Sequence, residues 1–289
     1  MRHGIVLFTS DRGITPAALA VQVERLGFDS LYVPEHTHIP VRREAVHPGT
    51  GTAALPDDRY LRTLDPWVAL ATAAAVTTRI TLSTAVALPA EHDPIALAKT
   101  LATLDHLSGG RVQLGVGFGW NTDELSDHGV PAKRRRTVLR EYLEAMTALW
   151  TQDEASYAGD FVSFGPSWAY PKPPQGRLPV LVGAAGTDKT FDWIVAHADG
   201  WINTPLETGI EEQAGALRRK WLDAGRSGQP RIVFLGARPD PDKMPELQAL
   251  GVTECVYGLP DGRPEEIVAR LERLAGRLGL PGWSPRQGS

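Results

Sequence analysis

Short runs of β-branched and other apolar residues alternate along the chain with longer segments in which apolar residues recur every three or four positions. The first pattern predicts buried strands and the second predicts amphipathic helices, so their alternation indicates βαβ units that build a parallel sheet. The expected strands cover residues 5–8, 30–33, 80–84, 112–116, 180–183, 200–203, 231–235 and 253–257.

Three of the expected helices begin with the same signal, an acidic or hydroxyl side chain followed by proline: Thr15-Pro16, Asp65-Pro66 and Asp93-Pro94. Such a pair supplies an N-cap and a suitable first helical residue. Eight strand–helix pairs close a (β/α)8 barrel, or TIM barrel, whereas an open doubly wound sheet usually has five or six strands. The expected helices cover residues 16–26, 66–74, 94–107, 135–150, 189–196, 211–222, 241–250 and 264–278.

Two segments interrupt the alternation. Residues 34–64 form a long loop, which indicates a lid or binding segment or else a disordered excursion. Residues 151–178 contain a hairpin pattern at 156–164 and a proline-rich connector, so we expect an insertion after the fourth helix. The chain is therefore predicted to be one barrel domain over residues 1–279, followed by a flexible tail at 280–289.

Charge and composition narrow the class of partner. The net charge of −4 offers no broad attraction to nucleic acid or to an anionic membrane, so we expect a small-molecule substrate. The single cysteine, Cys255, excludes an internal disulfide framework and fits a reducing compartment. The N-terminus does not resemble a signal peptide and no apolar run is long enough to span a bilayer, so we expect a cytoplasmic protein.

In a barrel of this kind the site lies at the carboxyl ends of the strands. Glu35, His36 and His38 follow the strand at 30–33 and are candidates for acid–base chemistry. A His-x-His pair also suggests a metal, but the later strand ends supply no further ligands, and we expect no metal centre. The alternative is that Glu35 and His36 only cap loops.

The next two strands end in small, uncharged residues. Residues 83–89 carry no charge and would suit a flat apolar ring. After the strand at 112–116, Gly117 and Gly119 permit close backbone approach, while Trp120 and Asn121 offer stacking and hydrogen bonding. The spacing does not fit G-x-G-x-x-G, which disfavours a Rossmann dinucleotide site, and a purely structural tight turn stays open.

The best anion site is the loop Gly183, Ala184, Ala185 and Gly186, because it opens a helix whose free N–H groups suit a phosphate. An ordinary glycine-softened turn is the alternative. The basic run at 133–136 either faces an acidic cofactor or is a solvated helix surface. No G-x-S-x-G elbow is present and Cys255 lies in an apolar strand, so covalent catalysis by the chain has little support.

These residues resemble the luciferase-like flavin and deazaflavin oxidoreductase superfamily, and within it the coenzyme F420-dependent branch of actinobacteria. The resemblance covers nearly the whole chain. It rests on Glu35-His36, on Ala85-Val86, on the sequence at 110–120, on Gly183–Gly186 and on residues 198–201.

The resemblance implies hydride exchange at C5 of F420, with the cofactor lying in the barrel mouth. It implies that Ala85-Val86 is a non-proline cis peptide behind the ring and that Gly183–Gly186 binds the phosphate. His36 would be the proton donor, and Glu35 would contact the ring or orient its neighbour. A homodimer is also implied, as is a separate F420- or flavin-reducing enzyme that supplies the reduced cofactor.

One departure from the family concerns the substrate. Trp120 stands where F420-dependent sugar-phosphate dehydrogenases have a catalytic glutamate, and Glu124 is expected to be too remote to replace it. The sequence therefore favours an apolar or conjugated substrate. Two alternatives remain: an FMN-dependent two-component monooxygenase that uses reduced flavin and O2, and a barrel that binds a flavin-like ligand without turnover.

Overall fold

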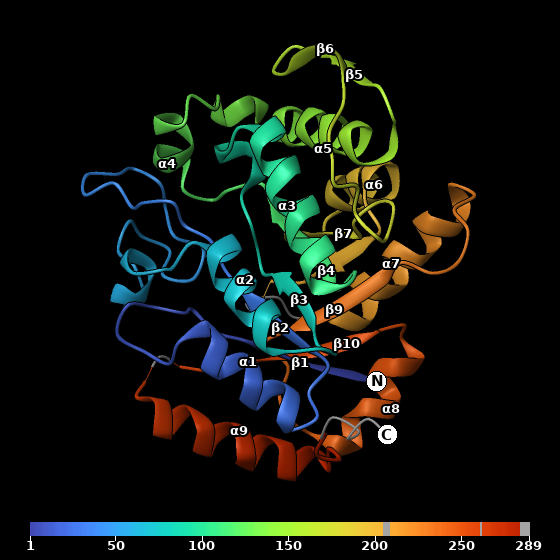
Figure 1. Ribbon diagram of the computed structural model, residues 1–289. Coiled ribbons are helices and arrows are strands. Elements are labelled where there is room, and N and C mark those ends of the chain that lie inside the picture. The colour runs from blue at the N-terminus through green and yellow to red at the C-terminus, as the bar shows by residue number, and fades with distance from the viewer. Residues whose placement is uncertain (205–208, 261, 284–289) are drawn as a thin grey trace, which may run out of the picture.

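Eight parallel strands close into a barrel in the computed structural model, which describes residues 1–204, 209–260 and 262–283 (Figure 1). β1 pairs with β2 on one side and with β10 on the other, which closes the ring. This confirms the predicted TIM barrel. In barrel order along the chain, the strands are β1 (Arg2–Val6), β2 (Ser30–Val33), β3 (Thr81–Thr84), β4 (Val112–Gly117), β7 (Val180–Gly183), β8 (Gly200–Ile202), β9 (Arg231–Leu235) and β10 (Glu254–Gly258).

Helices surround the barrel and begin where the sequence signals place them. The side chains of Thr15, Asp65 and Asp93 each accept a backbone N–H three residues later, at 3.3, 2.8 and 2.7 Å. The helices are α1 (Pro16–Arg25), α2 (Pro66–Val76), α3 (Pro94–Ser108), α4 (Thr122–Asp127), α5 (Arg135–Thr151), α6 (Asp188–His197), α7 (Ile210–Asp223), α8 (Met244–Ala249) and α9 (Pro264–Leu278).

The clearest differences from the sequence-based prediction concern three elements, β1, α4 and α8. The first strand was expected at 5–8 but is Arg2–Val6, because pairing with β10 aligns Arg2 with Glu254. Helix α4 was not predicted, since its six residues, TDELSD, carry no apolar repeat. The helix expected at 241–250 begins as a 3-10 turn, Pro241–Lys243, before α8, because Pro241 and Pro245 remove backbone donors from its start.

The predicted insertion contains an antiparallel hairpin, β5 (Ala155–Ala158) and β6 (Ser163–Ser167), which lies beside α5 in Figure 1. Glu141 of α5 holds the turn by accepting the Phe161 N–H at 2.8 Å. At the other end of the chain, the Trp283 N–H donates to the Arg25 carbonyl at 2.9 Å, so residues 280–283 pack against the end of α1. The rest of the expected tail, 284–289, lies outside the described residues.

The barrel interior has a polar layer near the amino ends of the strands. Tyr32 donates its hydroxyl to Glu254 at 3.0 Å and accepts from Gln113 at 3.1 Å, while Ser30 also bonds Glu254. Burial raises the pKa of Glu254. Toward the carboxyl ends the interior becomes apolar. Four partly exposed side chains form its upper surface, here called the mouth floor: Val6, Ala85, Val86 and Leu235.

Candidate active site

His36 and Glu124 form the polar centre of the barrel mouth. Residue 36 follows β2 and Glu124 lies on α4, yet His36 Nδ1 is 2.8 Å from Glu124 Oε2. Their side chains are 6% and 0% exposed. Burial opposes ionisation of Glu124, but bonds from His36 and from the N–H groups of Thr37 and His38 hold its pKa below the usual range. An ionised Glu124 therefore faces the imidazole of His36.

The Nε2 atom of His36 makes no hydrogen bond to any residue that the structure describes, so the imidazole presents a free nitrogen on the side opposite Glu124. Asn121 supports the carboxylate by donating its side-chain amide to Glu124 Oε2 at 3.2 Å. The Asn121 side chain is buried, and its Oδ1 has no partner among the described residues. Histidine held in this way can deliver or take a proton at Nε2.

Aromatic rings surround the imidazole of His36. The Tyr60 ring lies 5.6 Å from it and the Trp120 ring lies 5.7 Å from it, between ring centroids. His47 joins both neighbours, with its ring 5.1 Å from that of Tyr60 and 4.8 Å from that of Trp120. Tyr60 and His47 come from the long loop at 34–64, which therefore builds one wall of the mouth.

Glu35 does not point toward His36. Its carboxylate accepts the Leu88 N–H at 2.6 Å and contacts His92 Nε2 at 2.7 Å, and the residue is buried. Burial lowers the pKa of His92, but the bond and the charge of Glu35 outweigh it and raise the pKa overall. Glu35 thus bonds Leu88 and His92 rather than His36, and its contact with the ring of a bound cofactor stays a prediction. The residue instead ties β2 to the segment after β3.

Glu91 is a third buried carboxyl near this centre. It ends the 3-10 turn Pro89–Glu91, and neither of its oxygens has a hydrogen-bond partner among the described residues. Burial, together with the nearby carboxylates of Glu124 and Glu35, raises the pKa of Glu91 to about 9. Glu91 is therefore neutral at pH 7, which limits the negative charge behind His36.

Ala85-Val86 is a non-proline cis peptide, as the resemblance implied. The Val86 side chain fills the space beside two glycines: a Cβ at Gly117 would lie 2.5 Å from Val86 Cγ2, and one at Gly183 would lie 2.3 Å from Val86 Cγ1. These glycines therefore leave room for the Val86 side chain, and their contact with a cofactor stays a prediction. Gly119 has a φ of +76° and faces Leu125, so it serves the turn before α4.

The loop at 183–186 opens α6 as predicted. The N–H groups of Asp188 and Lys189 begin the helix and donate to no residue that the structure describes, while the Ala184 carbonyl accepts from Trp201 at 2.8 Å. Arg136 of α5 reaches the same helix, with a 3.3 Å bond to Thr190, and its guanidinium lies 4.1 Å from the Phe118 ring centre. The helix N-terminus and the guanidinium are both groups that attract an anion, so this loop remains the candidate anion site.

The other basic residues of the run face elsewhere. Arg134 pairs with Asp160 at 3.1 Å, and Arg135 bonds the Ala132 carbonyl at 2.7 Å. Of the four residues at 133–136, Arg136 is the one that the structure places beside the anion loop.

The structure thus brings His36, Trp120 and Asn121 together and places Val86 between Gly117 and Gly183. Sequence reasoning missed Tyr60, His47, Glu91 and Glu124. For Glu124 a signal was present, because Asn121-Thr122-Asp123-Glu124 resembles a helix start with acidic residues in its first turn. One turn of helix brings Glu124 to His36, and the expectation that Glu124 does not replace the catalytic glutamate of the sugar-phosphate dehydrogenases stays a prediction.

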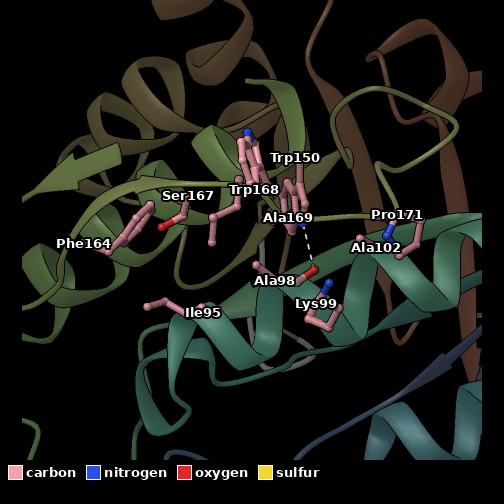
Figure 2. Close-up of a pocket in the computed structure, with 11 residues that line it drawn as sticks. Ile95, Ala98, Lys99, Ala102, Trp150, Phe164, Ser167, Trp168, Ala169 and Pro171 are labelled. Carbon is pink, nitrogen blue, oxygen red and sulfur yellow. Dashed lines mark hydrogen bonds between the residues drawn. The ribbon is translucent and has the colours of Figure 1, made fainter. Parts of the chain in front are cut away.

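A cavity of about 130 Å³ lies outside the barrel, between α3 and the segment after β6, where Trp150 donates to the Ala98 carbonyl at 3.0 Å (Figure 2). It contains none of the predicted site residues.

Within residues 1–204, 209–260 and 262–283, no group of three or more His, Cys, Asp or Glu side chains is arranged to hold a metal ion. None of the helices in these residues combines the length and the hydropathy that a membrane span requires.

Relatives in sequence include enzymes named for F420. An uncharacterized protein of Mycobacterium tuberculosis is 65% identical over 278 residues, which cover 96% of this chain and 99% of that protein. An F420-dependent glucose-6-phosphate dehydrogenase of Amycolatopsis mediterranei is 33% identical over 232 residues, covering 74% of this chain. The matched region spans 63% of that dehydrogenase.

Solved structures share the fold. A monooxygenase from Streptomyces bottropensis superposes with a TM-score of 0.74 at 21% identity, covering 96% of this chain and 98% of that one. The F420-dependent tetrahydromethanopterin reductase of Methanopyrus kandleri gives a TM-score of 0.71 at 17% identity, with the same coverage of both chains. A model of the luciferase-like monooxygenase family matches residues 15–238. The chain therefore belongs to the luciferase-like monooxygenase family of oxidoreductases, as its resemblance predicted.

Proposed function

We propose that this chain is an F420-dependent oxidoreductase that exchanges a hydride between C5 of the cofactor and a small apolar or conjugated substrate. The observation that carries the proposal is the buried His36–Glu124 pair in the barrel mouth. The same mouth contains the apolar mouth floor and the candidate anion site at residues 183–186. F420-dependent relatives support the choice of cofactor.

The residues present fit such a cofactor. Val6, Ala85, Val86 and Leu235 form an apolar surface that suits a flat ring, and all four are partly exposed. The loop at 183–186, the start of α6 and Arg136 would hold the phosphate. Bound F420 would supply the hydride chemistry, which the protein's own side chains lack.

The chain's own residues would manage the proton. His36 holds a proton at Nε2, and Glu124 stabilises the charged imidazole through Nδ1. Trp120 and Tyr60 pack beside the imidazole and restrict water around it.

The substrate is proposed to be apolar because the carboxylate that contacts His36 is not available to a ligand. Glu124 is fully buried, and both of its oxygens already accept hydrogen bonds, so it cannot contact a sugar hydroxyl. Trp120 occupies the adjacent wall with an aromatic face. This arrangement favours a substrate with an activated double bond over a sugar phosphate.

Parallel titrations of the purified apoprotein with F420 and FMN test this function. Binding of F420 at micromolar or tighter affinity, about −8 kcal/mol, with no comparable binding of FMN, would support it. Binding of FMN alone would replace it with the two-component monooxygenase. Binding of both without turnover would favour a passive ligand-binding barrel, and binding of neither would refute the cofactor site.

We further propose that the chain is a homodimer whose interface includes α2. This helix, PWVALATAAAV, has no charged residue, and its outer face exposes Val68 at 65% and Val76 at 47%. A helix that is apolar on all sides is normally covered, and a second copy offers the same apolar helix face. Sedimentation of the wild type and Val68→Glu tests this: a dimer that the substitution dissociates supports it, and a monomeric wild type overturns it.

We also propose that the enzyme works in the cytoplasm, where Cys255 stays reduced, and that a separate F420-reducing enzyme supplies its cofactor. An assay that couples an F420-reducing enzyme to this protein tests the supply. Substrate reduction that continues only while the reductase regenerates reduced F420 would support it.

A further inference from the structure

Tyr60 and His47 form a hydrogen-bonded pair beside His36. A backbone N–H determines which of the two side chains is the donor. The Gly49 N–H donates to His47 Nδ1 at 3.0 Å, and His47 Nε2 lies 3.1 Å from the Tyr60 hydroxyl oxygen. A backbone N–H can only donate, so Nδ1 carries no proton. In neutral His47 the proton must then be on Nε2, from where it is donated to Tyr60.

The surroundings of His47 favour this neutral form. The residue is 6% exposed. Burial, the charge of His36 and the charge of Arg43 all lower the pKa of His47, and only Asp57 opposes them. Burial likewise raises the pKa of Tyr60, so its hydroxyl keeps its proton at neutral pH.

Because Tyr60 accepts from His47, its own hydroxyl hydrogen is left for another acceptor. The hydroxyl donates to no residue that the structure describes. The Tyr60 and His36 ring centroids are 5.6 Å apart, so the two rings are neighbours.

We infer that Tyr60 is a catalytic residue that binds the carbonyl oxygen of the substrate, and that the substrate class is an alkene conjugated to a carbonyl group. His47 is the positioning residue that orients the Tyr60 hydroxyl. This inference rests on the proposed function, which supplies the reduced cofactor.

The β-carbon of the substrate accepts a hydride from the reduced cofactor, and the C=C electron pair moves to give an enolate. The enolate oxygen accepts the Tyr60 hydrogen bond, which is stronger to this charged oxygen than to the ketone. The α-carbon then takes the proton from His36 Nε2 as the carbonyl re-forms, and solvent returns a proton to His36.

The first test does not depend on turnover. The nitrogen-15 spectrum of the His47 side chain in the wild-type protein is expected to show the neutral Nε2–H tautomer from pH 7.5 to 9. An Nδ1–H tautomer or a charged ring over that range would overturn the assignment, because Tyr60 would then lose its fixed acceptor role.

The second test measures two quantities. Turnover is measured with 2-cyclohexen-1-one as substrate, and binding of 4-nitrophenolate, a planar oxyanion probe, is measured by calorimetry on the F420-loaded protein. Tyr60→Phe is expected to lower turnover about 100-fold and to weaken the probe at least about 10-fold, with F420 affinity unchanged. Tyr170→Phe, whose side chain is exposed and lies outside the mouth, is the matched control.

His47→Gln retains an N–H donor, so it is expected to preserve more of the probe binding than His47→Leu. If F420 fails to bind the wild type, the proposed function fails. If F420 binds and the enone is reduced, but Tyr60→Phe matches the wild type in both turnover and probe binding, the inference about Tyr60 fails alone.

Discussion

Gly183 faces Val86 so closely that a Cβ at position 183 would lie 2.3 Å from Val86 Cγ1. Gly183→Ala is therefore expected to destabilise the protein by about 1–3 kcal/mol, because overpacking forces the mouth floor to shift. F420 affinity should fall as well, since Val86 belongs to that floor. Urea unfolding and F420 titration measure the two effects.

The double variant Gly183→Ala/Val86→Ala removes the clashing methyl groups and should recover part of the lost stability. Gly276→Ala is the control, since nothing lies within 4 Å of the added carbon and the residue is inside α9. It should gain about 0.5–1 kcal/mol. Equal stability of Gly183→Ala and the wild type would contradict the packing argument.

The bond between His36 and Glu124 predicts that a substitution at Glu124 lowers turnover without lowering cofactor affinity. Glu124→Gln keeps the size of the side chain but removes the charge that stabilises the imidazolium, so the rate of reduction should fall about 100-fold. F420 affinity should stay within a factor of about three, because Glu124 is buried behind His36. Asp127→Asn, which alters the more exposed pair with His38, is the control and should retain activity.

Glu91 predicts a pH dependence of stability. Its pKa is about 9 in the folded chain, against 4.5 when unperturbed. A raised pKa contributes stability that is complete below the unfolded value and is lost as pH rises through the folded value. The wild type should therefore lose stability relative to Glu91→Gln by up to about 1.4 kcal/mol per pH unit between pH 5 and 9.

Urea unfolding of both proteins at pH 5, 7 and 9 measures this difference. The exposed Glu154→Gln variant serves as the control and should follow the wild type at all three values. A constant difference between the wild type and Glu91→Gln would show that Glu91 is ionised throughout.

Arg136 predicts a selective loss of cofactor affinity. Arg136→Gln removes the guanidinium beside α6 and should weaken F420 about 10-fold, with a smaller loss at high salt. Arg134→Gln is the neighbouring control, since Arg134 pairs with Asp160 instead. If both variants bind F420 equally, the run at 133–136 acts only through general charge.

The sequence was sufficient for the barrel because its signals are local. Proline after an N-capping side chain places the starts of α1, α2 and α3, and β-branched runs place the strands. Contacts across the barrel mouth join residues that are far apart in the sequence, so no local signal predicts them. Glu35 and Glu124 are both acidic residues after a strand, and nothing in their spacing indicates that Glu124, rather than Glu35, contacts His36.

The same limit applies to the loop at 34–64. Its length marked it as functional, but its polar and proline-rich residues gave no period from which a wall could be predicted. Tyr60 reaches His36 because the loop folds back over the mouth, and His47 is placed by a turn in which Gly49 bonds its ring. Such contacts depend on side-chain packing and appear only in three dimensions.

The two groups that flank His36 differ in how they are attached to the protein. Glu124 lies on a short helix and is fixed by hydrogen bonds to main-chain groups, whereas Tyr60 and His47 come from a loop that forms no strand of the barrel. Substitutions in this loop can therefore change which molecules are accepted without disturbing the sheet. The wall that Tyr60 and His47 build can in this way be altered separately from the His36–Glu124 pair.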